Sequence, residues 1–520
     1  MTPRRLVALL SLSLLTAACG GSAAQRAALH LQAANSSRGA AGGPAASAAA
    51  AGAPESGSGA ATAEPELAPS GSQLGSTAAP AAAGAAGAPA PAAGPAERAG
   101  AVPGLNPAAA QSRPAASAAG AGAPTPGTPA PTPGAPAAVP RGFNPNTDVG
   151  VTATSIKVGH IGIYSGPVGS FGANLSYAGR ATLQSFNDAG GINGRKLDVL
   201  VRDDAWDGTK GMNAARDLVE REHIFAFCCI MSVNTSDPLT PCLDEKKIPH
   251  IGSDGWGEPQ HKGAWTFPVS ASAVTEAHML AKWQAEHQQA KRVAIIYINN
   301  PTGRAYVKAY DEIIKKYGGE VVFSQPATFD DPGTTTFIAQ ARAQNIDTIS
   351  TYLDPGIFTR MVREAAAQNY KPKNAFSGAA GLYFEVTPNF TGPNGEGTIA
   401  ATHWETNDQD TPGLRRYKAT VEKYYPKIDH STWTKAGYVG ATIFGNLLKS
   451  LGLDVTRQRL KDAADRLTDF DSGLGPHLTW SPGHHRANKT IYLAQIQRLG
   501  DKFEFRKVAG PLVDEYAETP

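Results

Sequence analysis

Residues 155–203 read SIKVGHIGIYSGPVGSFGANLSYAGRATLQSFNDAGGINGRKLDVLVRD. The apolar run at residues 156–163 predicts a strand, which ends at the turn signal Ser165-Gly166-Pro167. A helix is predicted from about residue 172 to residue 189. Gly190-Gly191 ends this helix, because paired glycines tolerate the positive φ that is common at helix ends.

A second strand follows at once. Asn193-Gly194 predicts a tight turn into it, and the strand itself is expected at residues 197–201. A strand–helix–strand order favours two parallel strands joined by a right-handed crossover. The same alternation then continues, with helices at residues 209–222 and 236–246 and strands at residues 224–230 and 248–251.

The rhythm restarts after a break at residues 265–273. The second series has helices at residues 274–288, 304–317, 335–345 and 357–369, and strands at residues 292–298, 321–323, 348–353 and about 375–378. We therefore predict an α/β fold with two doubly wound parallel-sheet lobes joined by a hinge. Such sheets bind ligands beyond the carboxyl ends of their strands, so the cleft between the lobes is the expected site.

The last part of the chain is expected to return to both lobes. It contains a long helix at residues 432–451, a helix at residues 457–467 and a strand-like segment at residues 490–496. The predicted binding domain is residues 149–515. Lobe 1 is assigned to about 149–268 plus part of 430–475, and lobe 2 to about 274–405 plus about 476–515.

The first 148 residues have a different composition. All 39 aromatic residues follow residue 142, and 20 of the 39 prolines lie in residues 1–150. A segment rich in Ala, Gly and Pro buries too little apolar area to offset the entropy of ordering it, so a disordered tether is predicted at residues 19–148. It would hold the binding domain away from a membrane.

The N-terminus has the pattern of a signal peptide. Arg4 and Arg5 precede an apolar run at residues 6–15, and small residues lead to Cys19. The cysteine at the cut site resembles a bacterial lipobox. This resemblance implies a signal peptide at residues 1–18 and a lipid on Cys19; the alternative is an ordinary secretory signal followed by a chance cysteine.

Charge and motifs exclude several function classes. The chain carries 47 basic and 45 acidic residues and no Lys/Arg run after the N-terminus, which argues against nucleic-acid binding. A second apolar stretch of about 18 residues is absent from the sequence. The sequence contains no G-x-S-x-G, H-E-x-x-H or P-loop motif, so we predict neither an enzyme nor a cofactor. His484-His485 lies in a Pro/Gly loop and is predicted to be a solvated turn; no metal site is expected.

The order of motifs resembles the type I periplasmic binding proteins of the leucine/isoleucine/valine class over about residues 150–510. The resemblance implies a substrate-binding component of an ABC amino-acid importer. The most specific element is NDAGGINGR at residues 187–195, which we interpret as structural. The supporting elements are residues 156–158, Ser165-Gly166-Pro167, Asp203-Asp204, residues 247–252, residues 292–296, Gly475-Pro476 and Leu478-Thr479-Trp480.

The resemblance also implies a set of ligand-binding residues. In the family a ligand carboxylate is held at helix N-termini and an ammonium by acidic or carbonyl oxygen. Phe171 matches an aromatic residue that covers the ligand. The other positions carried over are Ser165, Ser232, Asn234, Thr235, Ser236, Ser253, Asp254 and Trp256 from the first lobe, and Thr302, Tyr352 and Asp354 from the second.

The pocket positions depart from the branched-chain pattern. We therefore expect a small polar, amino-acid-like ligand whose ammonium pairs with Asp254 or Asp354. The alternative interpretation makes both aspartates helix caps or turn residues. The departures are Val233 in place of a ligand-binding serine, Asp254 and Trp256 in place of small residues and threonine, Thr302 in place of an aromatic residue, Asp354 in place of a tyrosine, and Ala380 in place of a glutamate.

Three cysteines remain besides Cys19. Cys228 and Cys229 lie at a strand end, where successive side chains point to opposite faces, and Cys242 lies in the next helix. One disulfide between Cys242 and either Cys228 or Cys229 is one interpretation, and three buried thiols are the other. The spacing does not suit zinc. Trp206 lies where the family's first disulfide cysteine would stand.

The expected partners follow from these interpretations. They are a small-molecule ligand, an ABC permease, and the membrane through the lipid on Cys19, with the chain a monomer on the extracytoplasmic face. The alternative is a sensory receptor of the same fold that does not serve transport.

Overall fold

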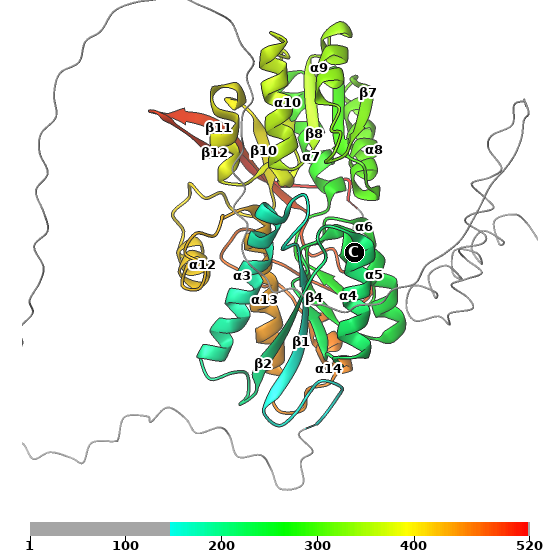
Figure 1. Ribbon diagram of the computed structural model, residues 1–520, viewed down its shortest axis with the longest axis vertical. Coiled ribbons are helices and arrows are strands. Elements are labelled where there is room, and N and C mark those ends of the chain that lie inside the picture. Colours follow the sequence, from blue (N-terminus) through cyan, green and yellow to red (C-terminus); the bar gives the residue numbers. More distant parts are fainter. Residues whose placement is uncertain (1–145, 518–520) are drawn as a thin grey trace, which may run out of the picture. The chain divides into compact units, whose positions relative to one another are not determined.

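The computed structural model describes residues 146–517. The predicted signal peptide, Cys19 and all but the last three residues of the predicted tether lie outside this range. Within it the predicted α/β class is confirmed. Five strands form one sheet in the order β2-β1-β3-β4-β5, and seven form a second sheet in the order β12-β11-β10-β9-β8-β6-β7 (Figure 1).

The first sheet is entirely parallel. β1 (Ser155–Gly162) pairs with β2 (Lys196–Asp203) along its full length, from Ser155 opposite Lys196 to Gly162 opposite Asp203. The order continues through β3 (Ala226–Cys228), β4 (His250–Ser253) and β5 (Thr266–Pro268). The helices between these strands are α3 (Gly169–Asp188), α4 (Gly208–Glu220), α5 (Val233–Lys246) and α6 (Glu258–Lys262).

Helices cover both faces of the first sheet. α4 and α5 contribute Leu218, Leu239 and Leu243 to a core cluster on one face. On the other face α3 packs beside α13 (Thr432–Ser450), which also contacts β4 (Figure 1). Two glycines allow this close approach, because a Cβ on Gly252 would lie 2.5 Å from the Cα of Gly440. Burial on both faces is complete at the central strands β3 and β4, where every residue is buried.

The second sheet is mixed. β6 (Arg292–Ile298), β7 (Glu320–Ala327), β8 (Thr348–Tyr352), β9 (Ser377–Gly378) and β10 (Ile399–Thr402) are parallel. β11 (Thr490–Leu499) and β12 (Lys502–Val513) add an antiparallel hairpin at one edge. The helices of this part are α7 (Ala273–Gln288), α8 (Pro301–Lys316), α9 (Thr334–Ala343), α10 (Pro355–Ala367) and α11 (Val386–Thr391).

Several elements differ from the sequence prediction. β5, β10, β12 and α12 (Pro412–Glu422) were not predicted, and α14 (Arg457–Ala464) ends earlier than expected. β5 and β10 are too short for a periodic signal to mark them. β12 begins with the alternation of exposed and buried residues that is typical of a half-buried strand, but it contains Pro511, which sequence rules count against a strand.

The NDAGGINGR turn has the structural role that the sequence predicted. Asn193 takes a positive φ of 50°, and its side-chain amide donates to the carbonyl oxygens of Leu448, Lys449 and Gly452 at the end of α13. Arg195 is 2% exposed and donates to the carbonyls of Thr152 and Leu453. The turn therefore anchors the C-terminal end of α13 to the first sheet.

The predicted disulfide between Cys242 and a strand cysteine is wrong. A disulfide joins Cys228 to Cys229. The prediction assumed that the two side chains point to opposite faces, but β3 ends at Cys228 and Cys229 has a φ of 62°. The strand alternation is therefore broken between the two residues, and neighbouring sulfurs meet.

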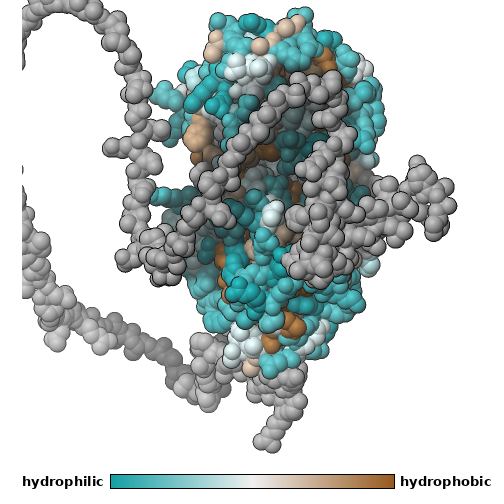
Figure 2. All heavy atoms as spheres, turned by 45° about the vertical axis from the view of Figure 1, so that its right-hand side comes forward, coloured by the Kyte–Doolittle hydropathy of each residue, from teal (hydrophilic) through white to brown (hydrophobic). Residues whose placement is uncertain are grey.

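The surface is largely hydrophilic on the face that Figure 2 shows, where hydrophobic residues form small patches. Within residues 146–517, no helix has the length and apolar composition needed to span a bilayer.

Candidate functional site

A cavity of about 60 Å³ lies where loops from the two sheets meet. Its wall is almost entirely apolar, and six of its fifteen residues are aromatic. The first sheet and its loops contribute Ile163, Val168, Phe171, Gly172, Leu175, Trp206 and Trp256; the second contributes Ile298, Phe329, Leu353, Asp354, Pro355, Gly381 and Phe384; and Trp433 begins α13.

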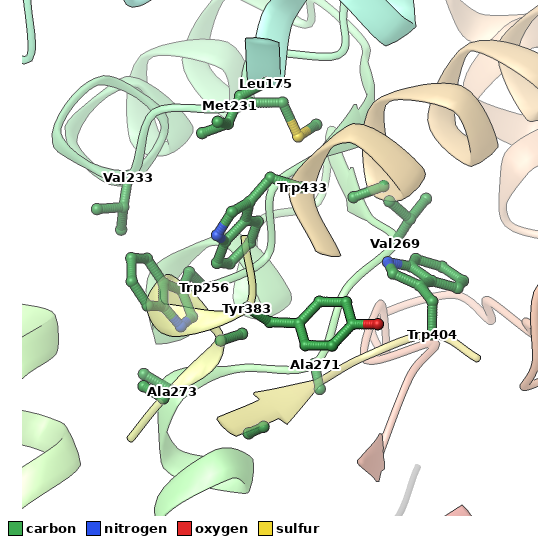
Figure 3. Packing of buried hydrophobic residues seen from close by; sticks show 14 of the residues in the cluster. Leu175, Met231, Val233, Trp256, Val269, Ala271, Ala273, Tyr383, Trp404 and Trp433 are labelled. Carbon is green, nitrogen blue, oxygen red and sulfur yellow. The ribbon is translucent and has the colours of Figure 1, made fainter. Parts of the chain in front are cut away.

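Aromatic rings from both sheets pack against one another at this wall. Trp256, from the loop after β4, lies 4.7 Å from Trp433 and 4.5 Å from Tyr352 of β8, measured between ring centroids. Figure 3 shows the Trp256 and Trp433 indoles side by side, with Leu175 beyond them. Trp256 and Trp433 are 7% and 3% exposed, so this cluster is a buried contact between the two lobes.

Trp206 reaches the cavity from an unusual backbone conformation. Its φ is 63° and that of Ala205 is 51°. Residues other than glycine rarely adopt this left-handed region. Hydrogen bonds hold the loop there: the Asn234 side chain donates to the Trp206 carbonyl, and the Trp206 N–H donates to Asp204, both at 2.9 Å. Asp204 in turn accepts from Thr235 Oγ1 at 2.6 Å.

Asp354 is the one charged side chain among the described residues that line the cavity. It is the N-cap of α10, and its Oδ1 accepts from the N–H groups of Gly356 and Ile357 at 2.7 and 3.3 Å. Its Oδ2 is buried and accepts no hydrogen bond from the described part of the chain. Burial raises the pKa of Asp354 above its ordinary value, while the two N–H donors oppose this change.

A second acidic group lies at the seam between the lobes. Gln260 Nε2 donates to Asp237 Oδ1 at 2.8 Å and to Asp254 Oδ1 at 2.9 Å, so it bridges two carboxyl groups of the first lobe. Thr302 Oγ1, from α8 of the second lobe, donates to Asp237 Oδ2 at 3.4 Å. Burial, with the neighbouring Asp254, raises the pKa of Asp237 to about 7, and burial raises the pKa of Asp254 to about 6.

Glu276 joins the lobes behind the tryptophans. It lies on α7 and is fully buried. Its Oε1 accepts from the Trp256 indole N–H at 3.1 Å and contacts His403 Nε2, and its Oε2 accepts from the Ala380 N–H at 3.2 Å. A buried carboxylate with three partners is well compensated, so Glu276 fixes the orientation of Trp256.

Three of the predicted ligand residues line the cavity: Phe171, Trp256 and Asp354. Both aspartates also have the turn or cap role of the alternative interpretation, since Asp254 Oδ1 accepts from the Trp256 N–H and Asp354 caps α10.

The other predicted residues lie outside the cavity lining. Ser165 donates to Asp203 at 2.5 Å, Ser236 donates to the Ile230 carbonyl, and Ser232 and Ser253 are fully buried. Asn234 and Thr235 support the Trp206 loop, Thr302 meets Asp237, and Tyr352 lies behind Trp256.

Sequence reasoning did not assign Trp206, Phe384 or Trp433 to the cavity. A signal existed for Trp206, which replaces an expected cysteine in a loop after a strand. Trp433 lay in a predicted helix and Phe384 outside any predicted element, so neither had a local signal.

No group of three or more metal-ligating side chains occurs in residues 146–517. The prediction that His485 belongs to a solvated turn is wrong. His485 is 1% exposed, stacks on Phe267 at 4.1 Å, and its two ring nitrogens contact the Thr266 carbonyl and Asp465. The loop folds back onto β5, which the sequence had not marked as a strand.

Comparison with known families matches residues 155–502 to the model for periplasmic binding proteins. Among curated relatives, the leucine-specific-binding protein of Salmonella typhimurium is 25% identical over 343 residues, which cover 64% of this chain and 88% of the relative.

Solved structures share the fold. A fatty acid ABC transporter substrate-binding protein from Thermomonospora curvata aligns with a TM-score of 0.64 at 19% identity, covering 71% of this chain and 95% of the other. A branched chain amino acid ABC transporter from Thermus thermophilus with bound valine aligns with a TM-score of 0.63 at 18% identity, covering 70% and 97%.

Proposed function

Because the chain belongs to the periplasmic binding protein family, we propose that it is the solute-binding component of an ABC importer. It binds a small molecule between its two lobes and delivers it to a permease, and a lipid on Cys19 anchors it to the extracytoplasmic face of the membrane. The observation that carries the proposal is the cavity, whose wall is divided between the two sheets.

The contacts around the cavity suit a receptor that closes on its ligand. Trp256 of the first lobe contacts Tyr352 and Glu276 of the second, and Asp237 meets Thr302 across the same seam. Separation of the lobes would expose these groups to water and open the cavity. A ligand that touches both walls stabilises the closed form, which is the form a permease would recognise.

The solute has a mainly apolar body. The relatives above are named for leucine, valine and a fatty acid, which share such a body, and the cavity here is lined by apolar side chains. The cavity holds about 60 Å³ in this closed arrangement, less than the roughly 300–1,000 Å³ of typical small-molecule sites, so the lobes have to separate to admit a solute. The apolar lining shifts the expected ligand from a small polar solute toward one with a large apolar surface and a single polar group facing Asp354.

Ligand binding is tested on the purified full chain by its thermal midpoint and tryptophan fluorescence. The panel contains amino acids, fatty acids, aromatic acids and amines. A ligand that binds only the folded chain stabilises it by about 2.7 kcal/mol at a hundred times Kd. The Ile298→Trp variant fills the cavity and should abolish the response, whereas Val508→Trp introduces the same indole at an exposed position and should not. A response unchanged in Ile298→Trp would place the ligand elsewhere.

Lipid anchoring and transport need separate tests. Cys19→Ser should remove labelling by a fatty-acid analogue and release the chain from the membrane fraction, with Cys242→Ser as the control. Deletion of the gene should abolish uptake of the solute identified by the panel. Retained uptake would favour a sensory receptor of the same fold over an importer component.

A further inference from the structure

The cavity wall carries negative charge and no positive charge. None of its described lining residues is Lys, Arg or His, and Asp354 is its one ionisable group. Both donors that reach Asp354 bind Oδ1, which leaves the buried Oδ2 without a donor from residues 146–517. A buried carboxylate oxygen without a partner is costly, and a ligand that brings a positive charge or an N–H group removes this cost.

The aromatic lining favours the same kind of ligand. Ring faces carry negative electrostatic potential and attract cations, most strongly for tryptophan. Trp206, Trp256 and Trp433 all line the cavity, together with Phe171, Phe329 and Phe384. The Trp256 indole N–H donates to the carboxylate of Glu276, which increases the electron density of that ring. Water is largely excluded from such a wall, so the attraction is weakly screened.

Two of the polar groups predicted to hold a ligand carboxylate are engaged within the protein, and two others, Ser232 and Ser253, are buried away from the cavity lining. Asn234 donates to the Trp206 carbonyl and Thr235 donates to Asp204, so neither is available at the predicted first-lobe loop. Asp204 and Asp254 lie beside that loop and would repel an anion. The described lining of the cavity therefore offers one anionic side chain and no cationic one, which favours a positive group over a negative one.

We propose that the solute is an organic cation with an apolar body, a quaternary ammonium or a protonated arylalkylamine, held by the three tryptophans and Asp354. The proposal rests on the binding function proposed above and names its substrate class. The cationic head lies against Asp354 and the tryptophan side chains, and the lobes separate far enough to admit the apolar body between their walls. Asn234 and Thr235 act as positioning residues, because they hold Trp206 in its strained conformation.

The test compares ligands of the same shape and different charge on the full chain. Choline and 3,3-dimethylbutan-1-ol differ by a charged nitrogen in place of a carbon. Phenethylamine and phenylacetate have similar apolar bodies and opposite charge. Isothermal titration and tryptophan fluorescence should show the two cations binding at least tenfold more tightly than their counterparts.

Two substitutions locate the charge effect. Asp354→Asn keeps the helix cap, since Asn caps as well as Asp, and should weaken cation binding at least tenfold while leaving the neutral ligand unaffected. Trp206→Leu should reduce the preference for choline over its neutral counterpart, whereas Trp206→Phe should retain most of it. Asp198→Asn, at an exposed position on β2, serves as the control.

The outcomes separate the two proposals. If phenylacetate, leucine or the neutral alcohol binds as tightly as the cations, and Ile298→Trp abolishes that binding, the receptor function stands and the cation class is refuted. Equal cation affinity in wild type and Asp354→Asn also refutes it. If no compound of any charge changes the thermal midpoint, both proposals fail.

Discussion

The wild type should become less stable as pH rises because Asp237 loses its proton, and the Asp237→Asn variant should lack this decrease. Asp237 lies at the seam between the lobes, where it faces Gln260, Thr302 and the acidic groups of Asp254 and Glu258. Burial and the charge of Asp254 raise its pKa to about 7, from 3.8 in the unfolded chain. The folded protein therefore binds a proton that the unfolded chain has already released, and folding stability falls between these two pH values.

The size of the effect follows from the two pKa values. Each pH unit between them changes the free energy of unfolding by about 1.36 kcal/mol, so raising the pH from about 4.5 to about 8 costs the wild type at most ~3 kcal/mol at this residue. Asp237 is partly exposed, and solvent screening reduces the figure to roughly 1–3 kcal/mol. Asparagine does not ionise, so Asp237→Asn should lack this contribution.

The assay is urea denaturation of wild type and Asp237→Asn at both pH values. The variant should gain roughly 1–3 kcal/mol relative to wild type on going from about pH 4.5 to about pH 8. Asp198→Asn should show no such change. Other groups titrate in this range, so the difference between proteins is the quantity of interest. If the difference in unfolding free energy between Asp237→Asn and wild type is the same at both pH values, the pKa of Asp237 is not raised in the folded chain and the reasoning is refuted.

Three further predictions concern the scaffold. Asn193→Ala removes the side chain that caps α13 and strains a positive φ, so urea denaturation should show a loss of about 1–3 kcal/mol, and a smaller loss for Asn193→Gly; equal losses would argue against the strain. Gly440→Ala places a Cβ 2.7 Å from the Cα of Gly252 and should cost about 1–3 kcal/mol; an unchanged midpoint would contradict the close packing of α13 on β4. Glu276→Ala leaves His403 buried without its partner and should cost about 3–5 kcal/mol, and the double variant with His403→Ala should cost less than the sum of the single losses; additive losses would show that the pair is not coupled.

Three residues of the cavity lining could be predicted because the family resemblance is carried by short motifs, and these residues lie beside such motifs. Phe171, Trp256 and Asp354 follow strand ends or begin helices, and the sequence marks such places through turns and caps. Asn234 and Thr235 were assigned from the same logic, yet they bind the Trp206 loop. A polar residue in a loop near a strand end contacts either a ligand or the protein, and residue type alone does not distinguish the two.

The sequence by itself determined the α/β class, the alternation of parallel strands and helices and the structural role of the NDAGGINGR turn, because these depend on periodicity and on backbone conformations within a few residues. The tertiary structure decided what meets across the lobes. Trp433 is about 230 residues from Trp206, and both line one cavity. The pairing of Cys228 with Cys229 followed from a break in strand alternation. The charge and polarity of the cavity depend on residues from distant segments, and only tertiary packing determines which of these residues line it.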